Sequence, residues 1–375
     1  MARIVFSSNT AFSLYNFRLP LMLALKERGF DVITVAPEDD EYSKLLREKF
    51  EFYSVRNLDR KGKNPIKDLK LMAEYYSLFK RLKPNLVINF TIKPNIYGGI
   101  ACGMLKIPSI SVIAGLGYAF INKGLLNRIV RILYRIAFKF NKFIVFMNPD
   151  DMKELSQIAG ENKSVLILSE GIDTEKFSSA ICEKKEKDKF IFLFVGRFLK
   201  DKGILELVKA GGKLYEQNKN FEIWLLGSVD RGNPNSLSDE QIEDIKRLPF
   251  VKILPFTKDV RPIICDADCV VLPSYYREGV PRVLLEAMSM EKPIITTDAP
   301  GCREVCIDGV NGFLVKPKDV GSLYSAMGKM IELKPEKLKE MGANGRKLVI
   351  EKYEISKIVT SYIKLIETSL KEIYT

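Results

Sequence analysis

Short apolar runs alternate with amphipathic helical stretches along the whole chain. Most runs are continuously apolar, which is typical of strands that are covered on both faces of a parallel sheet. The predicted strands form two series, one at 3–8, 31–36, 86–90, 109–114, 143–147 and 165–168, and the other at 190–196, 221–227, 251–255, 269–273 and 293–297. Repeated strand–helix alternation in two series predicts an α/β protein with two doubly wound, Rossmann-like domains.

A polar segment separates the two series. Residues 175–189, EKFSSAICEKKEKDK, are charged and lack apolar periodicity, which indicates a linker. The sequence therefore predicts an N-terminal domain over 1–172, a linker over 173–189 and a C-terminal domain over 190–352, followed by a helix over 353–375 that packs back on the N-terminal domain. Since such sheets bind ligands at the carboxyl ends of their strands, we expect a site in a central cleft between facing domains.

The composition indicates a globular chain with a basic excess. Its 375 residues are 46% hydrophobic and 28% charged, and the net charge is +12. This excess favours acidic partners such as phosphates, anionic lipid or nucleic acid. No signal peptide precedes the first predicted strand, and no apolar run approaches the roughly 20 residues of a membrane span. We therefore expect a cytoplasmic protein.

Cysteine and histidine usage bears on metal binding and on the redox environment. The chain has six cysteines and no histidine. Two cysteine pairs are spaced four residues apart, but zinc pairs usually have closer spacing and histidine partners, so zinc is not favoured. We expect buried free thiols in a reducing compartment. The six are Cys102, Cys182, Cys265, Cys269, Cys302 and Cys306.

Two glutamates lie in the segment that follows the strand CVVLP. One precedes a predicted helix, and the other lies within it. Pro281 suits the first turn of that helix, which is expected to reach about Met290. Its free N–H groups and positive dipole end make an anion site, with Glu278 at the rim and Glu286 inside. A buried carboxylate needs donors. A ribose diol would supply them, and the alternative is an ion pair with Arg282 or Arg303.

Four segments of the chain resemble a known enzyme family. They are SEGIDTEKF at 169–177, VGRFLKDKGILELVKA at 195–210, REGVPRVLLEA at 277–287 and DAPGCREVCIDGVNGFLVKPKD at 298–319. In this order, and with the Glu-x7-Glu spacing from Glu278 to Glu286, they resemble the retaining glycosyltransferases of family four. The resemblance implies the two-domain GT-B fold and transfer of a sugar from a nucleotide.

The resemblance also implies roles for individual residues toward a UDP-sugar donor. Arg197 and Lys202 would bind the diphosphate and offset the charge that develops as the nucleotide leaves. Glu278 would bind hydroxyls of the donor sugar, and Glu286 the ribose. Two cations beside a helix N-terminus suit such a leaving group, although two solvated surface charges are the alternative for Arg197 and Lys202. The implied donor site further contains Gly196, Gly279, Val280 and Pro281.

Segments of the N-terminal half resemble a smaller bacterial group within this family. They are 15–42, NFTIKPNIYGG at 89–99 and AGLGYAF at 114–120. They resemble bacterial galactosyl- and α-1,3-N-acetylgalactosaminyltransferases that extend saccharides on undecaprenyl diphosphate, which implies a lipid-diphosphate-linked acceptor. Many relatives have a histidine near Thr91 and Lys93, and this chain has none. A backbone carbonyl, Thr91 or Lys93 would take its place as an acceptor-side group.

Two further segments differ from motifs that bind a diphosphate or a metal ion in glycosyltransferases. The loop SSNTAFSLYNF at 7–17 lacks the paired glycines that often follow the first strand in relatives, so a close diphosphate approach there is less expected. The DAD sequence at 266–268 resembles a metal-binding pair of other glycosyltransferases, but it precedes a strand instead of following one. We interpret it as structural and expect no obligatory metal and no cofactor.

A basic stretch suggests a membrane surface as a partner. No acidic residue lies between Glu74 and Asp150. Within this stretch, cations recur every three or four residues along 125–143, at Arg128, Arg131, Arg135, Lys139 and Lys142. Such a helix suits the anionic inner face of the cell membrane. The alternative is an ordinary amphipathic helix that covers the sheet and holds its cations in solvent.

Together these patterns favour a retaining glycosyltransferase that moves N-acetylgalactosamine or galactose from a UDP-sugar to an undecaprenyl-diphosphate-linked saccharide. A soluble or different lipid acceptor is the first alternative. An oxidoreductase would require a glycine fingerprint after the first strand, which FSSNTAF lacks. No nucleic-acid-binding motif is present, so nucleic acid is not an expected partner. A non-catalytic glycan-binding relative is disfavoured because Glu278, Glu286, Arg197 and Lys202 are all present.

Overall fold

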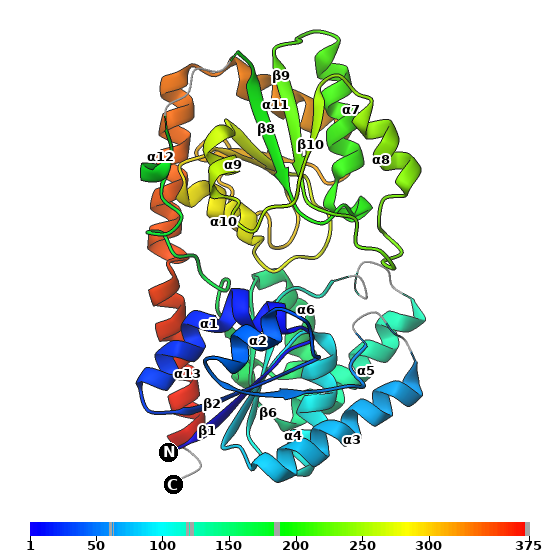
Figure 1. Ribbon diagram of the computed structural model, residues 1–375, viewed down its shortest axis with the longest axis vertical. Coiled ribbons are helices and arrows are strands. Elements are labelled where there is room, and N and C mark those ends of the chain that lie inside the picture. Colours follow the sequence, from blue (N-terminus) through cyan, green and yellow to red (C-terminus); the bar gives the residue numbers. More distant parts are fainter. Residues whose placement is uncertain (60–61, 63, 118–119, 121–123, 184–187, 372–375) are drawn as a thin grey trace. The chain divides into compact units, whose positions relative to one another are not determined.

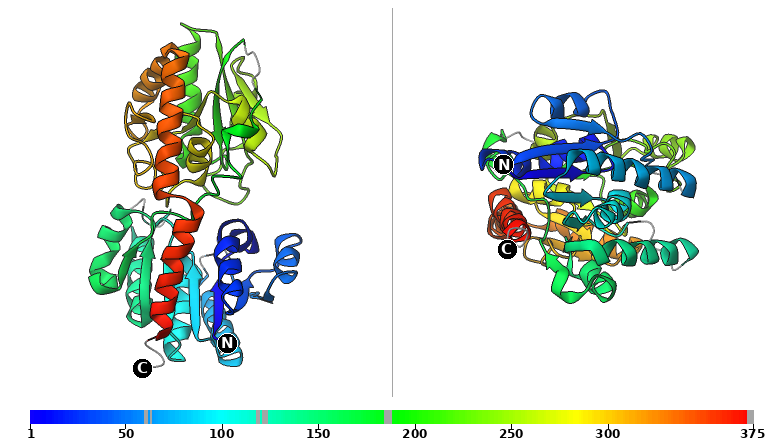
Figure 2. Two further views of the ribbon diagram at one scale, coloured as in Figure 1. Left: turned by 90° about the vertical axis from the view of Figure 1, so that its left-hand side faces the viewer. Right: turned by 90° about the horizontal axis from the view of Figure 1, so that it is seen from below.

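The computed structural model describes residues 1–59, 62, 64–117, 120, 124–183 and 188–371, and contains two α/β units (Figures 1 and 2). The first unit comprises Met1–Gly171 together with the chain from Ile355 onward. The second comprises Ile172–Glu354. Each unit has a parallel sheet with helices on both faces, so the expectation of two Rossmann-like domains is confirmed.

The first unit contains a parallel sheet of seven strands in the order β3-β2-β1-β4-β5-β6-β7. The strands are β1 (Arg3–Ser7), β2 (Asp31–Ala36), β3 (Glu51–Ser54), β4 (Leu86–Phe90), β5 (Ser109–Ile113), β6 (Asn141–Phe146) and β7 (Ser164–Leu166). The helices are α1 (Ala11–Glu27), α2 (Tyr42–Arg47), α3 (Pro65–Leu82), the π-helix η1 (Pro94–Gly98), α4 (Gly99–Met104), α5 (Leu125–Phe140), α6 (Pro149–Ala159), the short η3 (Glu161–Lys163) and α13 (Ile355–Lys371).

Helix α13 completes the core of the first unit. It lies beside α1 in Figure 1, and the two helices pack on one face of the sheet. Ile358 and Ile366 of α13 are buried with Leu14 of α1 and Phe6 of β1. The opposite face is covered by α3 and α4 around the buried Tyr75. Residues that are distant in the sequence therefore form a single hydrophobic layer.

The second unit contains a parallel sheet of six strands in the order β10-β9-β8-β11-β12-β13. The strands are β8 (Phe190–Val195), β9 (Phe221–Leu226), β10 (Val251–Leu254), β11 (Cys269–Leu272), β12 (Ile294–Thr297) and β13 (Gly312–Val315). The helices are the short η4 (Ser179–Ile181) and η5 (Lys200–Lys202), α7 (Ile204–Tyr215), α8 (Asp239–Lys246), α9 (Arg261–Asp266), α10 (Arg282–Ser289), α11 (Val320–Glu332) and α12 (Pro335–Lys352). Strands β8 and β11 are neighbours in register, with Cys269 opposite Phe192, so the loops that follow them leave the same edge of the sheet.

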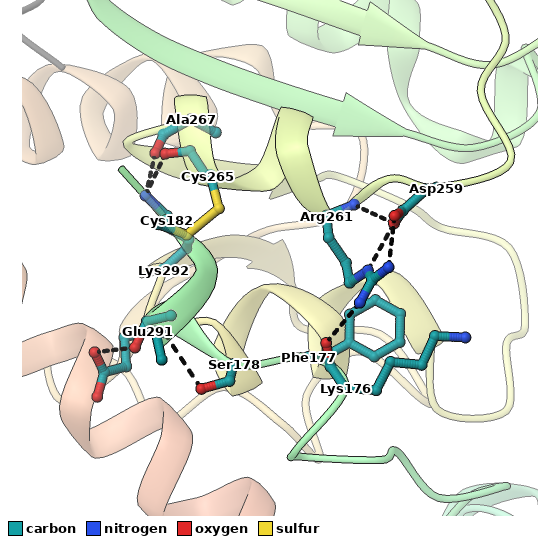
Figure 3. Close-up of a disulfide and its surroundings, with 12 residues drawn as sticks. Lys176, Phe177, Ser178, Cys182, Asp259, Arg261, Cys265, Ala267, Glu291 and Lys292 are labelled. Carbon is teal, nitrogen blue, oxygen red and sulfur yellow. Dashed lines mark hydrogen bonds and ion pairs between the residues drawn. A yellow bond between two sulfur atoms is a disulfide. The ribbon is translucent and has the colours of Figure 1, made fainter. Parts of the chain in front are cut away.

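The segment that enters the second unit is tied to it by several contacts. Ser289 Oγ at the end of α10 donates to the Phe177 carbonyl at 2.5 Å. Arg261 Nη1 donates to the Lys176 carbonyl at 3.3 Å (Figure 3). A disulfide joins Cys182 to Cys265 on α9, across 83 residues. The expectation of six buried free thiols is therefore wrong for this pair, because the turn of η4 brings Cys182 against α9. Cys102, Cys269, Cys302 and Cys306 are free and buried.

Candidate active site

The Lys-Gly turn after β8 is shaped by a close backbone approach. Gly203 has φ +78°, and a Cβ placed on it would lie 2.1 Å from the Pro273 carbonyl oxygen at the end of β11. A glycine is therefore required both for the left-handed conformation and for the space. This approach places Lys202 directly over the loop that follows β11.

Lys202 and Glu278, both predicted for the donor site, contact each other. The Lys202 ammonium donates to Glu278 Oε1, and the two side chains are only 13% and 14% exposed. Ser274, which is fully buried, also donates to Glu278 Oε1, at 3.1 Å. The two sequence-predicted residues are thus brought together, and their charges offset each other.

Two loops pack backbone to backbone around Glu278. The Tyr275 and Tyr276 N–H groups donate to the Asp201 carbonyl at 2.9 and 3.0 Å. On the other side, Gly301 has φ +85°, and a Cβ there would lie 1.6 Å from the Gly279 carbonyl oxygen. The loop from Ser274 to Pro281 is therefore fixed between the turn after β8 and the loop after β12.

Helix α10 begins where the sequence predicted. Pro281 is its N-cap, no acidic residue lies in its first turn, and Gly279, Val280 and Pro281 are buried. Glu286 Oε1 accepts from Arg282 Nε at 2.9 Å, one helical turn away. Burial raises the pKa of Glu286, and the neighbouring Arg282 opposes that shift. Glu286 is therefore ion-paired with Arg282 in this structure, and its side chain is 13% exposed.

Arg197 lies on the surface of the second unit, after β8. It is 45% exposed, and its Nη1 is 2.7 Å from Asp230 Oδ2. The Gly196 N–H donates to the carbonyl of Leu226, at the end of β9, at 3.0 Å. Arg197 therefore leaves the same sheet edge as Lys202, but it is paired with a different carboxylate.

The DAD sequence lies at the opposite edge of this sheet. Asp268 Oδ2 accepts from the Ile191 N–H at 2.8 Å, at the start of β8 and β11. Within the described ranges, no cluster of three or more acidic or cysteine side chains is arranged to hold a metal ion. Asp268 thus connects two strands, as an ordinary structural carboxylate does.

The segment after β4 contains the first-domain candidates Thr91 and Lys93. Thr91 has φ +74°, an uncommon conformation for a β-branched residue, and its buried hydroxyl has no hydrogen-bond partner in the structure. Lys93 Nζ is 2.6 Å from Asp68 Oδ1, and Tyr97 donates to the other oxygen of Asp68 at 3.0 Å. Lys93 is therefore held by an ion pair within the first unit.

Helix α5 has two apolar sides. Val130, Tyr134 and Phe138 are buried in the core of the first unit. On the other side lies an exposed apolar stripe that consists of Leu125, Ile129, Ile132, Ile136 and Phe140, which are 40 to 75% exposed. None of the described helices is long and apolar enough to cross a membrane.

The cations of α5 differ from the expected single row. Arg128, Arg135 and Lys139 are exposed. Arg131 Nη2 is 2.6 Å from Glu154 Oε1 of α6, and Lys142 lies on β6 because α5 ends at Phe140. The expectation of five cations on one helix is therefore wrong for Lys142, since the extended conformation of β6 begins at Asn141.

Comparison with known families matches both units of the chain. Residues 174–348 match the family described as "Glycosyl transferases group 1", and residues 3–148 match the family described as "Glycosyl transferase 4-like". The N,N'-diacetylbacillosaminyl-diphospho-undecaprenol alpha-1,3-N-acetylgalactosaminyltransferase of Campylobacter jejuni is 30% identical over 99% of this chain and 100% of its own length. The chain belongs to the glycosyltransferases of family four.

Other similar proteins agree with this assignment. The UDP-Gal:alpha-D-GlcNAc-diphosphoundecaprenol alpha-1,3-galactosyltransferase of Escherichia coli is 26% identical over 89% of this glycosyltransferase and 88% of its own length. An Anabaena protein solved with UDP and glucose has a TM-score of 0.80 at 19% identity, and covers 98% of this chain and 100% of its own. That likeness shows the GT-B fold.

Sequence reasoning missed two residues of this glycosyltransferase that shape the site. The Ser274 hydroxyl donates to the Glu278 carboxylate, and the Asp201 carbonyl accepts hydrogen bonds from backbone N–H groups of the next loop. Burial raises the pKa of Asp201, whose Oδ2 accepts from Asn235 at 2.9 Å. The available signals were the Ser after the strand CVVLP and the Asp beside Lys202, but their roles depend on contacts between loops more than 70 residues apart.

Proposed function

We propose that this glycosyltransferase transfers N-acetylgalactosamine or galactose from a UDP-sugar to an undecaprenyl-diphosphate-linked saccharide, with retention of the anomeric configuration. The observation that carries the donor side is the contact between Lys202 and Glu278 beside the N-terminus of α10. It gathers a cation, a carboxylate and the N-terminal end of a helix at one sheet edge, an arrangement suited to a nucleotide diphosphate linked to a sugar. The acceptors of the Campylobacter and Escherichia relatives, which are saccharides linked to undecaprenyl diphosphate, support the proposed acceptor.

The proposed roles follow from the charges of the site. Lys202, Arg197 and the first N–H groups of α10 stabilise the diphosphate as it leaves, and Glu278 orients the sugar hydroxyls. Glu286 accepts from the ribose. The acceptor hydroxyl attacks the face from which the nucleotide departs, and a leaving diphosphate oxygen takes its proton. In this scheme no metal is needed, because protein cations and helix N–H groups offset the developing charge.

The first experiment identifies the donor and the acceptor. Purified enzyme is incubated with a panel of UDP-sugars, with and without a polyprenyl-diphosphate-linked saccharide, in excess chelator, and UDP release is followed. We expect acceptor-dependent release with one N-acetylhexosamine or hexose donor, and an α-anomeric product by NMR. Lys202→Ala should reduce the rate at least about 100-fold. Activity that requires added manganese would contradict the metal-free scheme, and a β-linked product would contradict retention.

We further propose that the exposed apolar stripe of α5 binds the anionic inner surface of the cell membrane. The stripe is flanked on the same helix by the exposed cations Arg128, Arg135 and Lys139. Apolar side chains that insert between headgroups, next to cations that contact anionic lipids, are typical of an interfacial helix. Such a helix would hold the enzyme where a lipid-linked acceptor is found.

Vesicle binding tests this membrane proposal. Ile132→Ser with Ile136→Ser should weaken binding to vesicles that contain phosphatidylglycerol by about 30-fold, which corresponds to roughly 2 kcal/mol of apolar contact. Ile350→Ser, which alters a 42% exposed isoleucine on α12, serves as the control and should bind like wild type. Equal wild-type binding to neutral and anionic vesicles would contradict the proposal.

A further inference from the structure

The contact between Lys202 and Glu278 raises a question about donor binding. Under the proposed function, on which this inference rests, Lys202 binds the diphosphate and Glu278 binds the sugar, yet in the structure the two side chains bind each other. A diphosphate carries more negative charge than one carboxylate and competes for the ammonium. When Lys202 turns to it, Glu278 loses a charge-assisted donor while it remains only 14% exposed. A largely buried carboxylate in that position needs a hydrogen-bond donor that stays with it.

Ser274 is placed to supply that donor. Its hydroxyl is 3.1 Å from Glu278 Oε1, the same oxygen that Lys202 contacts. It also lies 3.3 Å from the Asp201 carbonyl. Since a serine hydroxyl has one proton, it donates to one of these acceptors at a time, and the carboxylate is both nearer and charged.

The Ser274 hydroxyl is held in place from several directions. It accepts from the Tyr276 N–H at 3.3 Å, and the Ser274 carbonyl accepts from Thr297 Oγ1 at the end of β12. The residue has no exposed surface. Its side chain is therefore oriented by the protein before any ligand arrives, whereas the flexible four-carbon side chain of the lysine can exchange one partner for another.

We propose that Ser274 is a positioning residue that keeps the Glu278 carboxylate oriented while Lys202 exchanges this carboxylate for the donor diphosphate. In the unliganded enzyme, Lys202 and Ser274 share Glu278 Oε1. In the donor complex, Ser274 retains that oxygen, and the Glu278 carboxylate oriented in this way binds the sugar hydroxyls. Ser274 therefore acts on the sugar through Glu278 and makes no contact with the diphosphate.

The test separates sugar positioning from nucleotide binding. Ser274→Ala should lower kcat for the UDP-sugar by about 10- to 100-fold, the usual effect of losing one hydrogen bond to a charged group. The Kd for UDP alone should change by less than about twofold, since UDP has no sugar for Glu278 to bind. Ser289→Ala is the matched control: it removes another fully buried hydroxyl of the same unit, which donates to Phe177 instead. It should retain wild-type kcat.

A double-mutant comparison tests whether Ser274 acts through Glu278. On a Glu278→Gln background, Ser274→Ala should lower kcat by less than about threefold further, because the carboxylate that it orients is already gone. An equal loss of UDP affinity and kcat, an unchanged kcat, or a full additional loss on the Gln background would overturn the proposal. If wild type turns over no UDP-sugar, the proposed function is wrong and this inference falls with it. If wild type is active and Ser274→Ala matches Ser289→Ala, only this inference is wrong.

Discussion

The Lys202 ammonium and the Glu278 carboxylate pair across the carboxyl ends of β8 and β11, with less than one-sixth of either side chain exposed. Removal of either partner leaves the other largely buried without its opposite charge. We expect Lys202→Ala and Glu278→Gln each to lower the free energy of unfolding of the second unit by about 2 kcal/mol. The double variant should lose clearly less than the sum of the two single variants.

Fluorescence gives a direct measurement of this coupling. The chain has one tryptophan, Trp224, which lies on β9 of the second unit and therefore follows unfolding of that unit in urea. Catalytic activity should not follow the stability losses. All three variants lack a group of the donor site, so all three should be nearly inactive. Strictly additive stability losses would mean that the contact contributes nothing to folding.

The raised pKa of Glu286 predicts a pH dependence of nucleotide binding. Burial, opposed by Arg282, holds this pKa above its ordinary value of 4.5. Only the ionised carboxylate accepts both hydroxyls of a ribose, so UDP affinity should increase as the pH rises through the raised pKa. Calorimetric titration of wild type and Glu286→Gln across pH 4.5 to 7.5 checks this. The diphosphate ionises identically in both, so a constant affinity ratio between them would contradict the expectation.

The same carboxyl has the opposite effect on folding. A carboxyl whose pKa is raised in the folded state binds more protons there than in the unfolded chain. Its contribution to stability is therefore fully present below about pH 4.5, the unfolded value, and is lost as the pH rises through the folded pKa. Relative to wild type, Glu286→Gln should become more stable as the pH rises through that window, as followed by urea unfolding with Trp224 fluorescence.

Gly203 should be intolerant of any side chain. An alanine there would combine φ +78° with a Cβ 2.1 Å from the Pro273 carbonyl oxygen, so the backbone itself has to move. We expect Gly203→Ala to cost about 3 kcal/mol of unfolding free energy. Gly309→Ala is the control, because Gly309 has φ +72° but nothing within 4 Å of its Cβ position, and should cost about 1 kcal/mol. Equal losses at both sites would contradict the steric argument.

Reduction of the disulfide between Cys182 and Cys265 should destabilise the second unit. The bridge spans 83 residues, and the chain-entropy model gives about 4.5 kcal/mol for a loop of that length. Urea unfolding with and without a dithiol reductant measures the loss. The variant with both residues changed to serine should be insensitive to reductant, which separates this bridge from the four buried free thiols. A wild-type curve unaffected by verified reduction would contradict the prediction.

Much of the fold was predictable because buried parallel strands have continuously apolar sequences. The missed strand β3, Glu51–Ser54, shows the limit of this signal: it lies at the sheet edge, and both of its ends are exposed. Its sequence, EFYS, therefore has no apolar run. Strand β13, Gly312–Val315, was not among the strands predicted from apolar runs, and it lies within the segment 298–319 that resembles known relatives.

The candidate site was predictable in its residues but not in its pairing. The spacing of Glu278 and Glu286 and the Lys-Gly turn were visible along the chain. The mutual contact of Lys202 and Glu278 was not, because it depends on β8 and β11 being neighbours in the sheet. The Cys182–Cys265 bridge was missed for a related reason: a bridge across 83 residues leaves no local pattern.

The position of α13 has a consequence for biosynthesis. The first unit needs Ile358 and Ile366 of α13 to cover one face of its sheet, whereas the second unit is a continuous stretch, Ile172–Glu354. During translation, every residue of the second unit is synthesised before α13. The first unit is therefore begun first and completed last, because one apolar face of its sheet stays uncovered until α13 has been synthesised.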